Sequence, residues 1–386
     1  MFKVVVDATP ILPKPSGVGL YVANLICSLA PLQTQENFQL GIVYQPGLKK
    51  WLLGDLSFPE FLKAYSELYM LPLPVRLSEF LVAVSFNPSL LHFDKYFGCP
   101  DIVHGTNYSV YPCQNSKKVM GIYDLTFIKY PKYSNSVTKT YTKRLKRCLQ
   151  WTDLVITISE SSKKDIVEHL KVNPEKVYVT PLASRYNHNY LGSKYYQIEK
   201  SVSYNFFQPY LLFVSTIEPR KNIKALVLAF NFLKQKYKIA HNLILIGQKG
   251  WHYKPILAEI EKSPWKSQIH HLEYLSDELV ALFYSRADVF VYPSYYEGFG
   301  MPVLEAMTLG APVVTSNTSS LPEVAGDAAL LIDPNDPMSL AEAILRVISD
   351  SQLRNQLIHK GKERAKLYSW ERTAKETLKA YRSLLI

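Results

Sequence analysis

Long hydrophobic runs are missing from this chain of 386 residues. No uninterrupted apolar segment reaches the ~18 residues that a membrane-spanning helix needs, and the richest stretch, residues 68–86, is broken by Pro72 and Pro74. Asp7 and Pro10 interrupt the first apolar residues before the core of a signal peptide develops. We therefore expect neither a membrane-spanning helix nor a secretory leader, and we predict a cytoplasmic protein.

Cysteine is also scarce. The four cysteines, Cys27, Cys99, Cys113 and Cys148, lie far apart, and no Cys-x-x-Cys pair or cluster of histidine and cysteine has the spacing of zinc ligands. This usage fits a reducing compartment. We therefore expect no structural metal.

Acidic side chains are the minority of the charged ones, because 33 Asp and Glu stand against 44 Lys and Arg. Most of the excess lies between Lys117 and Arg147, where nine basic residues accompany one acidic residue, Asp124. Such a segment is either a solvated helix face or a surface for an anionic membrane, an acidic acceptor or nucleic acid. The composition leaves these alternatives open.

Short apolar runs alternate with helical patterns over the first half of the chain. We expect strands at residues 3–7, 40–44, 101–104, 119–123, 154–159 and 177–180, and helices at 20–29, 139–151 and 161–170. Strands that alternate with helices indicate a doubly wound parallel sheet, so the predicted fold class is α/β.

The pattern stops over residues 184–208 and then resumes. We expect further strands at residues 210–215, 243–247, 269–274, 289–292, 312–315 and 330–333, and helices at 222–237, 277–285, 302–309, 338–348 and after Trp370. We therefore predict two Rossmann-like domains, residues 1–190 and 209–368, a linker at 191–208, and a C-terminal helix at 369–386 that packs back toward the first domain. Parallel sheets bind ligands beyond the carboxyl ends of their strands, so we expect a site in a cleft between the domains.

The most informative motif follows the predicted strand at residues 289–292. Gly298 and Gly300 precede a helix start, where glycines let a ligand approach the backbone and free N–H groups attract phosphate. Glu297 lies in the loop and Glu305 in the helix, and a carboxylate accepts hydrogen bonds from two neighbouring sugar hydroxyls. The alternative interpretation is a surface loop with an incidental pair of glutamates.

This motif resembles the paired glutamates of the retaining glycosyltransferases of family four, which have the GT-B architecture of two Rossmann-like domains. Residues 217–230, 275–294 and 312–334 resemble that family's donor-binding domain. The segments PSGVGLYVANL, DIVHGTNY and LVITISESSKKDI of the first half resemble its acceptor-side domain. The resemblance covers nearly the whole chain, and it implies transfer of a hexose from a nucleoside diphosphate sugar to a hydroxyl group.

The resemblance also assigns roles to single residues. Glu297 would contact the donor sugar, Glu305 the ribose hydroxyls, and Arg220 with Lys221 would neutralise the diphosphate. The remaining donor-binding residues that it implies are Gly17, Gly19, Tyr274, Leu275, Gly298, Phe299, Gly300, Met301 and Pro302.

The chain differs from the family pattern at some of these positions, and the roles of others stay open. Many relatives carry an arginine where Thr216 stands, and we expect Arg220 to supply that charge. Tyr123 replaces a histidine that contacts the donor sugar, while Asp124 either orients the acceptor or caps the following loop. His104, at the end of a strand, is either a buried, hydrogen-bonded histidine or a catalytic one.

The sequences HGTNY (residues 104–108) and EPRKN (residues 218–222) are most similar to those of bacterial enzymes that build surface polysaccharides. These enzymes are often mannosyltransferases that use GDP-mannose. We favour such an enzyme, acting on a saccharide or lipid-linked saccharide, in the cytoplasm or peripherally on the inner face of the membrane. A UDP-glucose-dependent transferase and a sugar-nucleotide epimerase of the same fold are the alternatives.

We expect no cofactor, because the nucleotide sugar is a substrate, and no metal, because the chain has no Asp-x-Asp pair. We also expect no nucleic-acid partner, since no nucleic-acid-binding motif accompanies the basic segment. A dinucleotide-dependent dehydrogenase would need a Gly-rich turn directly after the first strand, and the glycines begin several residues beyond Asp7.

Overall fold

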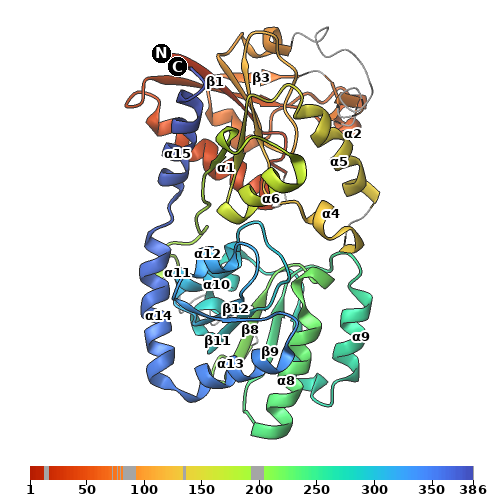
Figure 1. The fold of residues 1–386 in the computed structure, drawn as a ribbon, viewed down its shortest axis with the longest axis vertical. Coiled ribbons are helices and arrows are strands. Elements are labelled where there is room, and N and C mark those ends of the chain that lie inside the picture. Colours follow the sequence, from red (N-terminus) through yellow and green to blue (C-terminus); the bar gives the residue numbers. More distant parts are fainter. Residues whose placement is uncertain are drawn as a thin grey trace. The chain divides into compact units, whose positions relative to one another are not determined.

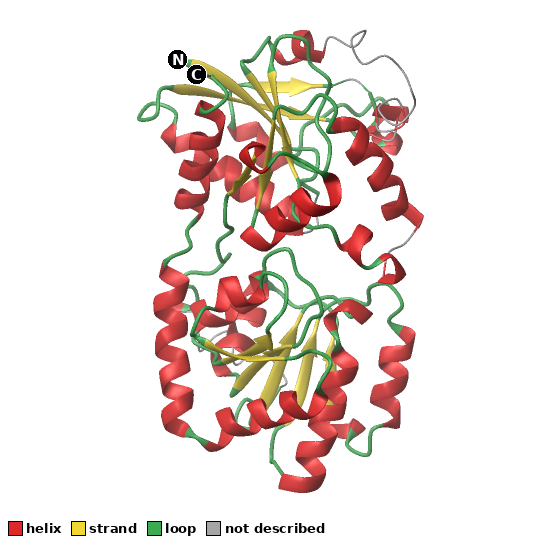
Figure 2. Ribbon diagram, in the orientation of Figure 1, coloured by secondary structure: helices red, strands yellow, loops and turns green. Residues whose placement is uncertain are grey.

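A computed structural model describes residues 1–12, 17–71, 73–75, 77, 78, 80, 93–133, 136–192 and 204–385. The chain divides into two compact units. The N-terminal unit comprises Met1–Lys129, Asn135–Leu182 and Trp370–Ile386, and the C-terminal unit comprises Tyr130–Ser134 and Ala183–Ser369. In each unit a sheet is flanked by helices on both faces (Figures 1 and 2).

The N-terminal unit contains a seven-stranded sheet in the order β3-β2-β1-β4-β5-β6-β7, and every pairing is parallel. Its strands are β1 (Phe2–Asp7), β2 (Phe38–Tyr44), β3 (Leu68–Met70), β4 (Ile102–Gly105), β5 (Lys117–Gly121), β6 (Leu154–Thr157) and β7 (Val177–Val179). Its helices are α1 (Gly17–Leu29), α2 (Leu48–Leu52), α4 (Thr126–Lys129), α5 (Ser136–Cys148), α6 (Glu160–Leu170) and α15 (Trp370–Arg382).

The C-terminal unit contains a six-stranded parallel sheet in the order β10-β9-β8-β11-β12-β13. Its strands are β8 (Tyr210–Val214), β9 (Asn242–Ile246), β10 (Ile269–Leu272), β11 (Val289–Tyr292), β12 (Val313–Ser316) and β13 (Ala329–Ile332). Its helices are α8 (Ile223–Tyr237), α9 (Lys254–Lys262), α10 (Asp277–Arg286), α11 (Met301–Leu309), α12 (Leu321–Ala325), α13 (Pro337–Ser349) and α14 (Ser351–Lys366). Short 3-10 helices include η2 (Glu60–Ala64) and η8 (Pro219–Lys221).

The two central strands of the C-terminal unit show why the sequence folds this way. Every residue of β8 and β11 is buried, because helices cover both faces of the sheet. A strand buried on both faces needs a continuous apolar run, and the sequences YLLFV and VFVY supply it. The predicted doubly wound α/β class is confirmed in both units.

Helix α15 returns the chain to the N-terminal unit, where it packs against α1. Thr373 donates a hydrogen bond to the carbonyl of Pro181 at 2.6 Å, and the Tyr381 hydroxyl lies 2.7 Å from His104 Nδ1. In the other direction the chain passes to the C-terminal unit after Leu182, earlier than the predicted boundary at residue 190. Most of the predicted linker, residues 193–203, lies outside the described residues.

The described residues include six strands and helices that the sequence pattern did not indicate. They are strand β3, the short helices α2, α4 and α12, and the longer helices α9 and α14. None of the described helices combines the length and the apolar content that crossing a bilayer would require.

Candidate donor site

The predicted donor-binding residues of the C-terminal unit gather where β8 and β11 end. The loop after β8 leads through η8 to Arg220 and Lys221, and the loop after β11 leads to Glu297. The two loops are joined by a hydrogen bond from Tyr295 N to the carbonyl of Arg220 at 3.0 Å. Carboxyl ends of adjacent parallel strands meet at one edge of a sheet, so the topology brings the cations and the carboxylate together.

Glu297 is the centre of a buried ion cluster. Its Oε1 accepts a hydrogen bond from Lys221 Nζ at 2.6 Å, and its Oε2 accepts one from Arg220 Nη1 at 3.0 Å. Burial by itself would raise the pKa of Glu297, but Arg220 and Lys221 outweigh burial and lower the pKa to about 2. Glu297 is therefore an anion at neutral pH.

The two cations are themselves held by further side chains. Arg220 Nη2 donates to Glu218 Oε1 at 2.7 Å, and Lys221 Nζ donates to the Tyr292 hydroxyl at 2.8 Å. Burial and the Arg220 charge lower the pKa of Lys221, yet Glu297 and Tyr292 raise it more, so the ammonium stays charged. A negatively charged ligand at this edge would meet two cations that are already desolvated and oriented.

Glu305 occupies a second buried position, one turn inside α11, and is 1% exposed. Its Oε1 accepts from Arg185 Nε at 2.8 Å, and its Oε2 accepts from Arg185 Nη2 and from the Tyr284 hydroxyl, both at 3.3 Å. Burial raises the pKa of Glu305 above its ordinary value, and the Arg185 charge opposes this rise. Arg185 and Tyr284 are not among the site residues predicted from the sequence.

The loop between the two glutamates is fixed by serines of the segment after β12. Ser319 Oγ accepts from Glu297 N at 2.9 Å, and Ser320 Oγ donates to the carbonyls of Glu297 and Phe299 at 2.9 and 2.7 Å. Gly300 has φ +110°, and a Cβ there would lie 2.9 Å from Leu321 Cδ2. Glycine is therefore required where the loop turns into α11.

The remaining predicted residues of this loop take different environments. Phe299 is buried with its ring edge-on to Tyr368, whereas Met301 and Pro302 are half-buried in the first turn of α11. Gly298 lies between Glu297 and Phe299 in the same loop. Backbone N–H groups of a first helical turn have no acceptor within the helix, so this turn is a suitable place for an anionic ligand.

The structure does not bring every predicted donor-site residue into this cluster. Tyr274 is exposed and Leu275 half-buried in the loop between β10 and α10. Gly17 and Gly19 open helix α1 in the N-terminal unit, and residues 13–16, directly before them, lie outside the described residues. The donor roles of these four residues stay predictions.

Two candidates of the N-terminal unit have local structural roles. His104 is fully buried, and its pKa falls to about 3 because burial disfavours the charged ring. Its Nδ1 contact with Tyr381 fastens α15 to the end of β4. Asp124 Oδ1 accepts from Thr126 N at 3.0 Å at the start of α4, which is the capping role that the sequence analysis left open. Catalytic roles for both stay predictions.

Tyr123, which stands where many relatives have histidine, points into the interior. Its hydroxyl donates to the carbonyl of Thr106 at 2.5 Å, and its ring packs edge-on against Tyr21 and Tyr108. Burial raises the pKa of Tyr123 well above its usual range. In this arrangement the hydroxyl hydrogen of Tyr123 is already donated to a backbone carbonyl of the same unit.

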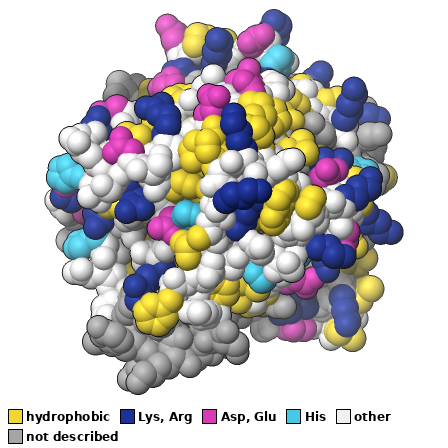
Figure 3. Space-filling model, turned by 90° about the horizontal axis from the view of Figure 1, so that it is seen from below, with side chains coloured by type: hydrophobic (Ala, Val, Ile, Leu, Met, Phe, Trp, Pro, Cys, Tyr) yellow, Lys and Arg dark blue, Asp and Glu magenta, His cyan; other side chains and the backbone are white. Residues whose placement is uncertain are grey.

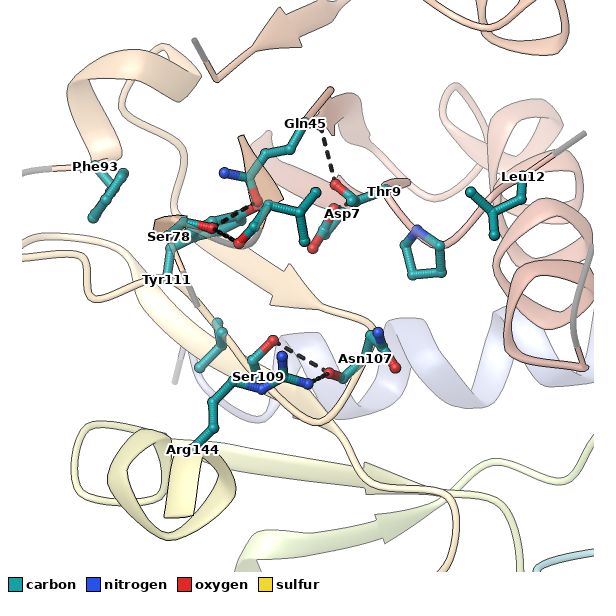
Figure 4. A pocket seen from close by; sticks show the side chains of 13 residues that line it. Asp7, Thr9, Leu12, Gln45, Ser78, Phe93, Asn107, Ser109, Tyr111 and Arg144 are labelled. Carbon is teal, nitrogen blue, oxygen red and sulfur yellow. Dashed lines mark hydrogen bonds between the residues drawn. The ribbon is translucent and has the colours of Figure 1, made fainter. Parts of the chain in front are cut away.

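A cavity of about 230 Å³ lies at the carboxyl ends of β1, β2 and β4 in the N-terminal unit. Asp7 and Gln45 line one wall, and Asn107 and Arg144 line the other (Figure 4). Gln45 Oε1 accepts from the Tyr111 hydroxyl at 2.8 Å. Burial raises the pKa of Asp7 to about 6, although hydrogen bonds from Thr9 and the charge of Arg144 lower it. None of these residues was predicted from the sequence to belong to a site.

Comparison with known proteins identifies the family. The model of the glycosyl transferases group 1 matches residues 198–364. The O-antigen chain mannosyltransferase B of Escherichia coli is 34% identical over 293 residues, which are 73% of this chain and 74% of that protein. The chain belongs to the glycosyl transferases group 1. This glycosyltransferase is also 28% identical, over 61% of its length and 55% of the relative's, to an MMP alpha-(1->4)-mannosyltransferase of Mycolicibacterium hassiacum.

Solved structures show the same fold. Sucrose-phosphate synthase of Thermosynechococcus elongatus has a TM-score of 0.73 at 21% identity, covering 100% of this chain and 99% of that one. WaaG, a glycosyltransferase involved in lipopolysaccharide biosynthesis, has a TM-score of 0.68 at 16% identity, covering 97% and 98%. These likenesses confirm the predicted GT-B fold of the glycosyltransferase.

Proposed function

We propose that this glycosyltransferase moves mannose from GDP-mannose to a hydroxyl of a saccharide or lipid-linked saccharide, with retention of the anomeric configuration and without a metal ion. The observation that carries the proposal is the cluster of Glu297 with Arg220 and Lys221 at the ends of β8 and β11. The names of the Escherichia coli and Mycolicibacterium relatives, both mannosyltransferases, support the choice of sugar.

The cluster suits the departure of a nucleoside diphosphate. As the bond to the sugar breaks, negative charge develops on the leaving phosphate, and Arg220 and Lys221 supply desolvated donors for that charge. Glu297 holds both cations in place and, in the proposed complex, lies beside the donor sugar. The leaving phosphate takes the proton of the acceptor hydroxyl, so no side chain is required as a covalent nucleophile.

Product analysis tests this function. The purified protein is incubated with GDP-mannose or UDP-glucose and a saccharide acceptor, the released nucleoside diphosphate is measured, and the new linkage is examined by NMR. We expect GDP release and an α-mannoside. UDP release with a glucoside would establish the UDP-glucose alternative, and a new sugar nucleotide without diphosphate release would establish an epimerase.

We propose that the cavity in Figure 4 receives the acceptor sugar. Its polar side chains both donate and accept hydrogen bonds, as sugar hydroxyls do, and Phe93 and Val110 add apolar surface for a sugar ring. Its charged lining residues, Asp7 and Arg144, offset each other, which suits a neutral ligand. A volume of about 230 Å³ is small for a ligand site and fits one sugar unit rather than an oligosaccharide.

Asp7→Asn is expected to raise the KM for the acceptor about 10-fold, because a hydrogen bond to a charged group is worth about 1.5 kcal/mol. The affinity for GDP, measured by calorimetry, should stay within about twofold of the wild type. An unchanged acceptor KM would exclude Asp7 from acceptor binding. An equal loss of GDP affinity would show that the substitution disturbs the whole fold.

At least three of the nine basic residues at 117–147 are engaged within the fold. Arg144 is buried, Lys118 pairs with Asp153 at 3.0 Å, and Lys129 pairs with Asp165 at 2.7 Å. Figure 3 shows the molecule from below the view of Figure 1, and on that face Lys and Arg side chains are interspersed with Asp, Glu and hydrophobic side chains. Lys117, Lys132, Lys143 and Lys146 are exposed, so a membrane surface would meet both these lysines and the exposed apolar residues of the N-terminal unit.

We propose that helix α2 docks the protein on an anionic bilayer. None of its residues is buried, Leu52 and the following Leu53 are 69% and 73% exposed, and Lys49 and Lys50 accompany them. Insertion of a leucine side chain contributes about 1.5–3 kcal/mol, and each nearby lysine about 1 kcal/mol, which salt weakens.

The double variant Leu52→Asp/Leu53→Asp is therefore expected to lose at least about 10-fold in liposome affinity, measured by flotation with anionic vesicles at low salt. Leu228→Asp is the matched control, because Leu228 is an exposed leucine of α8 in the other unit, 47% exposed. Equal binding of the two variants, or no binding of the wild type, would contradict docking through α2.

A further inference from the structure

Arg185 follows β7 along the chain, in the part of the chain that belongs to the C-terminal unit. Its guanidinium faces two carboxylates, since Nε and Nη2 contact Glu305, and Nη1 contacts Asp277 Oδ1 at 2.9 Å. The guanidinium also lies over the ring of Tyr186, 5.1 Å from the ring centre. Four contacts with three residues therefore fix both the position and the plane of this side chain.

Of the two carboxylates, Glu305 depends more on Arg185, because it is the buried one. The Glu305 side chain is 1% exposed, whereas the Asp277 side chain is 53% exposed. A buried carboxylate is costly unless a cation and hydrogen bonds compensate it. The Arg185 fork supplies both, because it matches the geometry of a carboxylate and stays charged at any pH at which proteins fold.

We propose that Arg185 is a positioning residue for nucleotide binding, which keeps the Glu305 carboxylate ionised and aimed so that it accepts hydrogen bonds from the two ribose hydroxyls. This inference rests on the proposed function, in which a nucleoside diphosphate sugar is the donor. Arg185 acts through Glu305 and does not itself touch the reacting atoms.

The hydrogen-bonding capacity of the carboxylate permits this role. Each carboxylate oxygen has about two lone-pair sites. On Oε1, one is taken by the short contact with Arg185 Nε, which leaves one for a hydroxyl. On Oε2, the contacts with Arg185 Nη2 and Tyr284 are both 3.3 Å long, and a ribose hydroxyl would replace the weaker of them.

Loss of Arg185 would change the charge of Glu305 as well as its position. Burial already raises the pKa of Glu305 in spite of the arginine, so without the arginine the carboxyl group would bind a proton at a higher pH. A protonated carboxyl donates one hydrogen bond and accepts fewer. Discrimination between ribose and deoxyribose should then depend on pH in the variant and not in the wild type.

The experiment measures the affinities for GDP and 2′-deoxy-GDP by calorimetry at about pH 7 and about pH 9, with UDP and 2′-deoxy-UDP as a second pair. We expect the wild type to prefer the ribonucleotide about 10-fold at both pH values, because one hydrogen bond to an ionised carboxylate is lost in the deoxy compound. Arg185→Ala should reduce this ratio to about 2 at neutral pH and regain part of it at the higher pH. Arg185→Lys should give an intermediate ratio, since it keeps the charge and loses the fork.

Arg364→Ala provides the matched control. Arg364 also holds a loop, through hydrogen bonds to the carbonyls of Glu323 and Val324, but it has no contact with either donor-site glutamate among the described residues. We expect this variant to lose thermal stability and to keep the wild-type ratio. If Arg185→Ala does not fold, two milder variants replace it in the same measurement. Arg185→Lys keeps the charge, and Asp277→Asn weakens one contact of the arginine without removing the arginine.

Three results would overturn the inference. Arg185→Ala could weaken both nucleotides by one factor with an unchanged ratio, which would place the arginine against another part of the ligand. The variant could bind both nucleotides as the wild type does, or the wild type could fail to distinguish ribose from deoxyribose. Failure of the proposed function looks different, because the wild type would then bind none of the four nucleotides and release none from a nucleotide sugar.

Discussion

Lys221→Ala is expected to lower turnover at least about 100-fold, and added magnesium should not restore it. Lys221 is 5% exposed, and its ammonium lies 2.6 Å from Glu297 and 2.8 Å from the Tyr292 hydroxyl. A preorganised donor in a site without water stabilises developing charge far more than a solvated one does, and its loss commonly costs two or more orders of magnitude. Arg220 would remain, but it is shared with Glu218.

The same experiment tests the proposed independence from metal. A nucleoside diphosphate leaving group needs positive charge, and Arg220, Lys221 and the first turn of α11 supply it in the proposed mechanism. Wild-type activity should therefore survive excess EDTA. Activity that disappears in EDTA and returns with magnesium would contradict the assignment.

Lys234→Ala controls for the general cost of removing a buried lysine. Lys234 lies on α8, is 6% exposed and donates to the carbonyl of Ile239 at 2.8 Å. We expect a lower melting temperature with turnover close to that of the wild type. If Lys234→Ala and Lys221→Ala lost activity equally, the loss would reflect stability rather than charge at the donor site.

The strands of both sheets could be predicted from the sequence because burial on both faces leaves a strong local signal. The twelve predicted strands agree with the structure to within two residues at each end. Strand β3 was missed because it contributes three residues, none of them fully buried. A strand of that length carries too little pattern to stand out from the loops around it.

Helix α14 was missed for a different reason. Among its sixteen residues, Leu357 and Gly361 are the buried ones, so the helix has almost no apolar stripe. It is stabilised instead by the Asp350 cap and by close packing on α11, where a Cβ at Gly361 would lie 3.2 Å from Met307 Cγ. Packing of this kind depends on a partner that is distant in sequence.

The donor site was predictable to the extent that its residues lie in segments that resemble the family. Glu297, Glu305, Arg220 and Lys221 were named from the sequence, and the structure places them at two adjacent strand ends and in one helix. Arg185 was not named, because it lies in a segment without periodicity and meets Glu305 across 120 residues of chain. A contact over that distance leaves no local pattern.

Glu305→Gln is expected to weaken GDP binding about 10- to 100-fold, whereas Glu297→Gln should leave GDP affinity within about threefold and lower turnover about 100-fold. The reason is a division of roles. Glu305 is proposed to accept two ribose hydroxyls, which are present in GDP and in GDP-mannose alike. Glu297 is proposed to lie beside the sugar, which GDP lacks, and it orients the two cations that stabilise the leaving phosphate.

Calorimetry with GDP and single-turnover measurements with GDP-mannose separate the two effects. Glutamine is the appropriate replacement at both positions, because alanine at residue 297 would leave Arg220 and Lys221 buried beside a cavity, and breaking a buried ion pair costs about 3–5 kcal/mol of stability. Glutamine keeps the volume and one acceptor oxygen, so the melting temperature should fall less than it would with alanine, although the charge that pairs with the buried cations is lost. Equal losses of GDP affinity in the two variants would refute the division of roles, because both carboxylates would then contact the nucleotide rather than one the nucleotide and the other the sugar.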